Sequence, residues 1–111
     1  MTISIFYKNI SSDAPLEEFI NQKIGGLDKF FKDPNGLAEI RVEVCKPSKH
    51  HRSGEIYYVE INLKIGGKLL RATCQHEDLR NAIVDARNEL GRQVKKLKEK
   101  RTDQVRKIKI Q

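Results

Sequence analysis

The residues best able to do chemistry in this chain are the lysines and arginines of its last quarter. Residues 86–111 carry ten Lys and Arg against three Asp and Glu, whereas residues 1–85 carry twelve of each sign. The last quarter therefore accounts for the whole net charge of +7. Ammonium and guanidinium groups bind phosphates and carboxylates, so this local excess indicates a polyanionic partner.

These basic residues are spaced for a helix, which we expect from about Asp78 to about Lys100. Apolar residues recur there at intervals of three or four. They fall within an arc of roughly 80° when each residue advances by about 100°. This stripe must face the rest of the protein, and it consists of Leu79, Ile83, Ala86, Leu90, Val94 and Leu97.

The remaining surface of this helix divides into two flanks of different charge. One flank, at roughly 80–160° from the start of the stripe, contains no acid and is formed by Arg80, Arg87, Gly91, Lys95 and Lys98. The opposite flank, at roughly 200–280°, has both signs and is formed by Asp85, Glu89, Arg92, Lys96 and Glu99. A merely solubilising surface usually intersperses both signs. The acid-free flank therefore predicts a nucleic-acid contact.

The elements that position this helix follow from the hydrophobic pattern. Alternation predicts strands at residues 2–8, 37–46, 56–65 and 68–75. A first helix follows the cap residues 11–13, has Pro15 in its first turn and ends at the turn signal of residues 33–36. Gly25-Gly26 is a weak point in this helix. Gly66-Gly67 predicts a two-residue hairpin turn.

This order, β-α-β-β-β-α, predicts an α+β fold with a four-stranded sheet and two helices packed on one of its faces. We assign residues 1–100 to one domain and residues 101–111 to a short basic tail. No run approaches the roughly 18–20 apolar residues that span a bilayer. The first residues lack the pattern of a signal peptide. We therefore expect a cytoplasmic protein.

RNA suits this surface better than DNA. No helix-turn-helix, zinc-finger or zipper pattern is present. A β-α-β-β-β-α domain with a basic helix resembles double-stranded RNA-binding domains, which read shape, phosphates and 2′-hydroxyls. The few aromatic residues mostly occupy core-like positions and predict no stacking surface for single strands. Contacts to the RNA backbone are therefore favoured over sequence readout.

The last helix also resembles that of a known family. Residues 76–83 (HEDLRNAI) and 90–98 (LGRQVKKLK) are similar to the final helix of the ribosome hibernation promoting factors and ribosome-associated inhibitors, also called sigma-54 modulation proteins. The first helix, with Lys23, Leu27 and Lys29, is similar to the first helix of that family. The chain resembles the short form of the family. At the position of Arg80, members of the family usually have an aromatic residue.

The resemblance implies a protein without catalytic activity or cofactor that binds the small ribosomal subunit and its rRNA. Members occupy the channel of tRNA and mRNA and inhibit translation under stress or in stationary phase. With Arg80 added from the acid-free flank, the implied rRNA contacts are Lys23, Lys29, Arg80, Arg87, Arg92, Lys95, Lys96 and Lys98. We expect a monomer off the ribosome, with no membrane or small-molecule substrate. Ribosome dimerisation and the idling of single ribosomes both remain open.

Other chemistry has weaker support. The candidate metal ligands lack the spacing of a zinc site, and they are Cys45, His50, His51, Cys74 and His76. We expect no metal and two reduced, buried cysteines. No phosphate-binding glycine loop or nucleophile motif is present, so we expect no enzyme. Two alternatives to a ribosomal role remain, a general double-stranded RNA-binding domain and a basic adaptor for an acidic protein.

Overall fold

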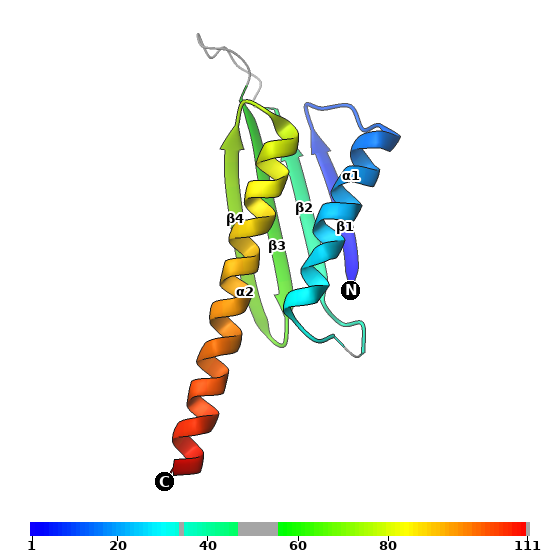
Figure 1. Cartoon of the computed structure of the whole chain (residues 1–111). Helices are drawn as coiled ribbons and strands as arrows, with labels where there is room; N and C mark the ends of the chain where they lie inside the picture. The colour runs from blue at the N-terminus through cyan, green and yellow to red at the C-terminus, as the bar shows by residue number, and fades with distance from the viewer. Residues whose placement is uncertain (34, 47–55, 111) are drawn as a thin grey trace.

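Four strands form one sheet, and two helices cover one of its faces (Figure 1). The computed structural model describes residues 1–33, 35–46 and 56–110, and their side chains as far as residue 100. The elements are β1 (Thr2–Lys8), α1 (Ala14–Gly25), the 3-10 helix η1 (Gly26–Phe30), β2 (Glu39–Cys45), β3 (Tyr57–Ile65), β4 (Lys68–His76) and α2 (Leu79–Ile110). Residues 47–55, between the predicted second and third strands, lie outside the described residues, and so do the candidate metal ligands His50 and His51.

The strands lie in the order β1-β2-β3-β4. β1 and β2 are parallel, so α1 and η1 carry the chain back across the sheet between them, and the other neighbours are antiparallel. The turn between β3 and β4 is formed by Gly66 and Gly67, with φ of 54° and 76°. Both angles are positive, as a type I′ hairpin turn requires, so the predicted turn is confirmed.

The hydrophobic core lies between the sheet and the two helices. Alternate residues of the strands point to the helices, and the row Ile5, Val42, Ile61 and Ala72 crosses the sheet at one level. The middle of the predicted stripe on α2 is fully buried, and Leu79 and Leu97 at its ends are half-buried. The predicted α+β fold is therefore confirmed.

The first helix ends earlier than we expected. Its N-terminus is capped as predicted, because the backbone N–H of Leu16 donates to the Asp13 carboxylate at 2.7 Å. The α-helix stops at Gly25, however, and η1 continues it to Phe30. Glycine favours the helical conformation least among ordinary residues, so the pair Gly25-Gly26 allows the helix to tighten there into a 3-10 turn.

The last helix, in contrast, is longer than expected, since it continues to Ile110 instead of ending near Lys100. Residues 101–110 contain no glycine or proline that would stop it. At about 1.5 Å per residue, α2 is about 48 Å long, whereas the nine residues of β3 span about 30 Å. The end of α2 therefore projects beyond the sheet (Figure 1).

The two cysteines are half-buried thiols, not the fully buried residues that we expected. Cys45 is paired with Tyr58 and Cys74 with Val59, so they lie on opposite faces of the sheet. Burial raises the pKa of the Cys74 thiol, with a smaller contribution from the charge of Asp85.

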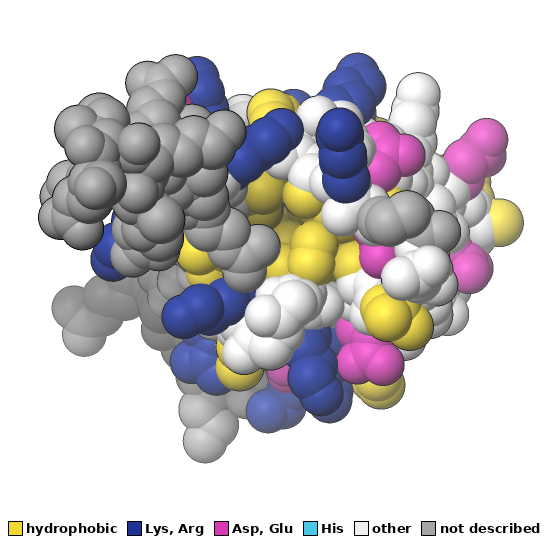
Figure 2. Space-filling view, turned by 90° about the horizontal axis from the view of Figure 1, so that it is seen from below, with side chains coloured by type: hydrophobic (Ala, Val, Ile, Leu, Met, Phe, Trp, Pro, Cys, Tyr) yellow, Lys and Arg dark blue, Asp and Glu magenta, His cyan; other side chains and the backbone are white. Residues whose placement is uncertain are grey.

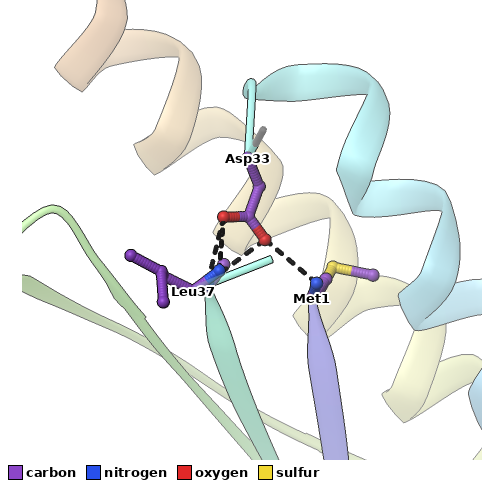
Figure 3. Close-up of polar contacts among 4 residues, drawn as sticks. Met1, Asp33 and Leu37 are labelled. Atoms are coloured by element: carbon purple, nitrogen blue, oxygen red, sulfur yellow. Dashed lines mark hydrogen bonds and ion pairs between the residues drawn. The ribbon is translucent and has the colours of Figure 1, made fainter. Parts of the chain in front are cut away.

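A polar network joins the start of β1 to the segment before β2 (Figure 3). The carboxylate of Asp33 forms an ion pair with the N-terminal amine of Met1 at 3.0 Å and accepts the backbone N–H of Leu37 at 2.8 Å and that of Ala38. The hydrogen bond from the N-terminal amine is the main cause that lowers the pKa of Asp33. Asp33, which the sequence marks only as a turn residue, therefore links the beginnings of the neighbouring strands β1 and β2.

Asp33→Asn should lower the stability of the fold in a pH-dependent way. Because the pKa of Asp33 is lowered on folding, its charge stabilises the native state above the ordinary Asp pKa, and this contribution is lost as pH falls through the lowered value. Urea unfolding of both proteins from about pH 7 to about pH 3 should show a difference that shrinks toward low pH. Asp28→Asn, a change at an exposed acid of η1, is the control; an equal, pH-independent loss in both variants would contradict the ion pair.

Candidate nucleic-acid interface

The predicted basic residues of α1 and α2 meet around one aromatic ring. The Lys23 ammonium lies 5.6 Å from the centroid of the Phe19 ring, and the Arg80 guanidinium lies 5.1 Å from it. A cation over a ring face is attracted by the ring quadrupole. Phe19 therefore holds cations from two helices side by side, at the point where α2 begins. Asp78 caps this end of α2 by accepting the backbone N–H of Asn81 at 3.1 Å.

Further along α2, its acid-free flank faces α1 and η1. A Cβ built on Gly26 would lie 3.8 Å from the Arg87 guanidinium, and one built on Gly91 would lie 3.4 Å from the Phe30 ring. Gly91 is buried and allows this close approach of η1. Lys95 and Lys98 follow at the next turns of the same flank and are exposed.

We call the line of cations along this inter-helix boundary the cationic seam. It consists of Lys23, Arg80, Arg87, Lys95 and Lys98. Glu17 and Glu18 of α1 fall about 100° or more away from Phe19 around that helix and do not face the seam. Among the described residues, Lys23, Arg80, Arg87 and Lys95 form no ion pair with an acid. Lys29 is exposed on η1 beside Phe30.

Two of the predicted RNA contacts lie on the other flank of α2. Arg92 forms an ion pair with Glu89, with 3.0 Å between its Nε and the carboxylate, and this hydrogen bond is the main cause that lowers the pKa of Glu89. Gln93 donates to the backbone carbonyl of Arg71 on β4 at 2.8 Å, so this flank faces the β4 side. Arg92 and Lys96 are thus separated from the cationic seam and lie beside an acid.

The structure also exposes aromatic residues that the sequence placed in the core. Phe30 is 39% exposed beside the seam, and Phe6 is 44% exposed on the helix-free face of the sheet. The Arg41 guanidinium lies 4.1 Å from the centroid of the Phe6 ring. The alternation of β1, in which Phe6 shares a face with Ser4, was the available signal for its exposure.

Other kinds of site have little support in the described part of the chain. Among the side chains that the structure describes, those of residues 1–33, 35–46 and 56–100, no group of three His, Cys, Asp or Glu is arranged to hold a metal. None of the helices formed by these residues is long and apolar enough to cross a bilayer.

Comparison with known proteins agrees with the resemblance found in the last helix. Residues 3–102 match the family described as Sigma 54 modulation protein / S30EA ribosomal protein. The chain belongs to this family. The family is non-enzymatic, which confirms the prediction that this protein is not an enzyme.

Relatives in this family carry a functional name. The chain is 30% identical over 91 residues to the ribosome hibernation promotion factor of Staphylococcus aureus, covering 81% of this chain and 44% of that protein. It is 32% identical over 100 residues to the factor of the same name from Bacillus subtilis, covering 90% of this chain and 50% of that protein. The chain thus spans about half the length of the curated relatives that it matches.

Solved structures of the same fold are also known. The N-terminal domain of Thermus thermophilus Protein Y superposes with a TM-score of 0.72 at 22% identity, covering 87% of this chain and 99% of that one. A ribosomal subunit interface protein from Coxiella burnetii superposes with a TM-score of 0.69 at 16% identity, covering 89% of this chain and 99% of that one. At these identities, the likeness establishes the fold alone.

A double-mutant cycle should detect the cation–π contact between Phe19 of α1 and Arg80 of α2. Phe19→Leu and Arg80→Gln should be coupled by about 0.5–1 kcal/mol in the free energy of unfolding, because each variant removes the same cation–π contact. Urea unfolding of the two single variants and the double variant measures this coupling. The pair Phe19→Leu and Lys95→Gln, which share no contact, is the control, and equal coupling in both cycles would contradict the contact.

Proposed function

We propose that the protein is a ribosome hibernation factor. On this proposal it binds the rRNA of the small ribosomal subunit in the channel of tRNA and mRNA, in the cytoplasm, and inhibits translation under stress or in stationary phase. The observation that carries the proposal is the cationic seam, together with relatives that are named ribosome hibernation promotion factors.

The arrangement of the seam suits an RNA backbone. Its cations come from two helices and follow one boundary, and Lys23, Arg80, Arg87 and Lys95 have no acidic partner among the described residues. Cations without a partner gain more from a phosphate than cations that must first leave a carboxylate. Arg92 is bound to Glu89, so we assign it a smaller part in RNA binding than Arg87.

Inhibition would follow from occupancy. A folded domain whose longest extent is 59 Å fills space that tRNA and mRNA would otherwise use. The chain needs no catalytic group for this effect, since two macromolecules cannot hold the same site. Release of phosphate counterions would make the binding strongly dependent on salt.

Charge reversal in the seam should strongly weaken binding. Lys95→Glu combined with Lys98→Glu should weaken binding to isolated small subunits on the order of 100-fold, because two charge-assisted contacts become repulsive. It should also lower the slope of log K against log salt by about 2. Co-sedimentation with small subunits across a salt series, with and without tRNA, measures both quantities.

The matched control reverses two exposed lysines away from the helices. Lys8→Glu combined with Lys64→Glu changes the net charge equally, from +7 to +3, but on the helix-free face of the sheet. This variant should bind nearly as the unaltered protein does. Equal weakening of both variants would mean that overall charge, not the seam, governs binding. Salt-sensitive pelleting that tRNA does not block would leave a general RNA-binding domain, and no pelleting at low salt would reject the ribosomal role.

A second comparison separates the two flanks of α2. Arg87→Gln should weaken binding to small subunits more than Arg92→Gln does, since Arg92 is already bound to Glu89. Each variant removes one positive charge from the same helix, so their difference does not arise from net charge. The same co-sedimentation assay measures both, and a larger loss in Arg92→Gln would contradict the assignment of the seam.

A further inference from the structure

The cationic seam leads at its lower end to an apolar pocket of about 220 Å³. The pocket lies between η1, the end of β3 and the underside of α2, and it is lined by Phe30, Phe31, Lys32, Ile65, Val94, Leu97 and Lys98. Figure 2 looks onto this end of the molecule, where hydrophobic side chains at the centre are bordered by Lys and Arg side chains above, below and to the left, and by Asp and Glu side chains on the right. Among the described residues, no acid lines the pocket.

The pocket and the seam are parts of one surface. Lys98 belongs to both, and the Phe30 ring that lines the pocket packs on Gly91 of the acid-free flank. A polyanion that follows the seam toward the projecting end of α2 therefore passes the mouth of the pocket. Two exposed lysines, Lys32 and Lys98, line the pocket and supply positive charge at its edge.

We propose that this pocket receives one unpaired nucleobase of an RNA that is bound along the seam. This inference rests on the proposed function and names the feature of the RNA that the seam would select. The base would stack on the exposed Phe30 ring, and its neighbouring phosphates would be held by Lys32 and Lys98. Apart from the two lysines, the lining side chains are apolar. The pocket would therefore accept any base and read no base edge.

The charges favour a nucleotide over a second copy of the chain. Each copy carries a net charge of +7, and the part of α2 beyond the sheet, residues 101–110, is itself basic. A second copy would therefore bring positive charge to a rim that is already positive, at a cost in electrostatic repulsion. A nucleotide supplies both an aromatic ring for the apolar lining and an anion for the rim.

The test compares two RNA hairpins that differ by one unpaired base. One hairpin is fully paired, and the other carries a single bulged 2-aminopurine, whose fluorescence falls when it stacks. The unaltered protein should bind the bulged hairpin about tenfold more tightly than the paired one, with a loss of 2-aminopurine emission. Phe30→Leu should bind both hairpins equally, at the affinity of the unaltered protein for the paired one, and should leave the emission high.

Phe6→Leu is the matched control, because Phe6 is exposed to a similar extent on the opposite face of the sheet. It should keep both the preference for the bulged hairpin and the loss of emission. Thermal unfolding of both variants checks that the fold is intact. If Phe30→Leu keeps the preference, or Phe6→Leu loses it, the pocket does not receive the base and the proposal is overturned.

The remaining outcomes separate this proposal from the proposed function. If the unaltered protein binds both hairpins equally and without a change in emission, RNA binding stands and the pocket proposal fails. If it binds neither hairpin and does not sediment with small subunits, both proposals fail. An acidic protein partner is tested with a glutamate-rich peptide that carries one leucine. If the bulge has no effect, and this peptide binds the unaltered protein but not Phe30→Leu, the pocket belongs to an acidic protein partner and the proposal is overturned.

Discussion

The structure depends on the packing of the apolar stripe of α2 against β3 and β4. The buried residues Ile83, Ala86 and Leu90 fix the rotation of the helix about its own axis, because turning it would expose them to water. Once that rotation is fixed, the acid-free flank must face α1 and η1, and the mixed flank must face the β4 side. The hydrophobic core thus sets the direction in which the charges point, although none of the charged residues whose burial the structure describes belongs to it.

The layout of the fold could be predicted because its signals are local. Alternation, helical periodicity and the Gly66-Gly67 turn each depend on residues that are close together in the chain. The change from α1 to η1 could not be predicted in the same way, because glycine permits several outcomes at Gly25 and tertiary packing selects one of them. The length of α2 was underestimated because the basic run of residues 101–110 has no apolar stripe strong enough to mark a helix.

The candidate site was predictable one helix at a time. Periodicity grouped Arg80, Arg87, Lys95 and Lys98 on one flank, and the structure keeps them together. The contact of Lys23 and Arg80 with a shared ring depends on how two helices pack, which no local pattern encodes. The same holds for Phe30, which looked like a core residue until its position against Gly91 was known.

The two helices give the seam a property that a single basic helix would lack. On an isolated helix, each long cationic side chain must lose its conformational freedom when it binds a phosphate, and this loss weakens binding. Here the Phe19 ring holds two cations before any ligand arrives, and Arg87 lies near Gly26 of η1 and donates to Asn88 at 2.8 Å. Part of the conformational entropy that these side chains would lose on binding RNA is therefore already lost when the protein folds. A partly ordered line of cations would discriminate by the path of the phosphates, because only an RNA whose backbone follows the same line reaches all of them at once. The surface should therefore select RNA by shape, and the pocket at its end would add a requirement for one base that is free to leave its stack.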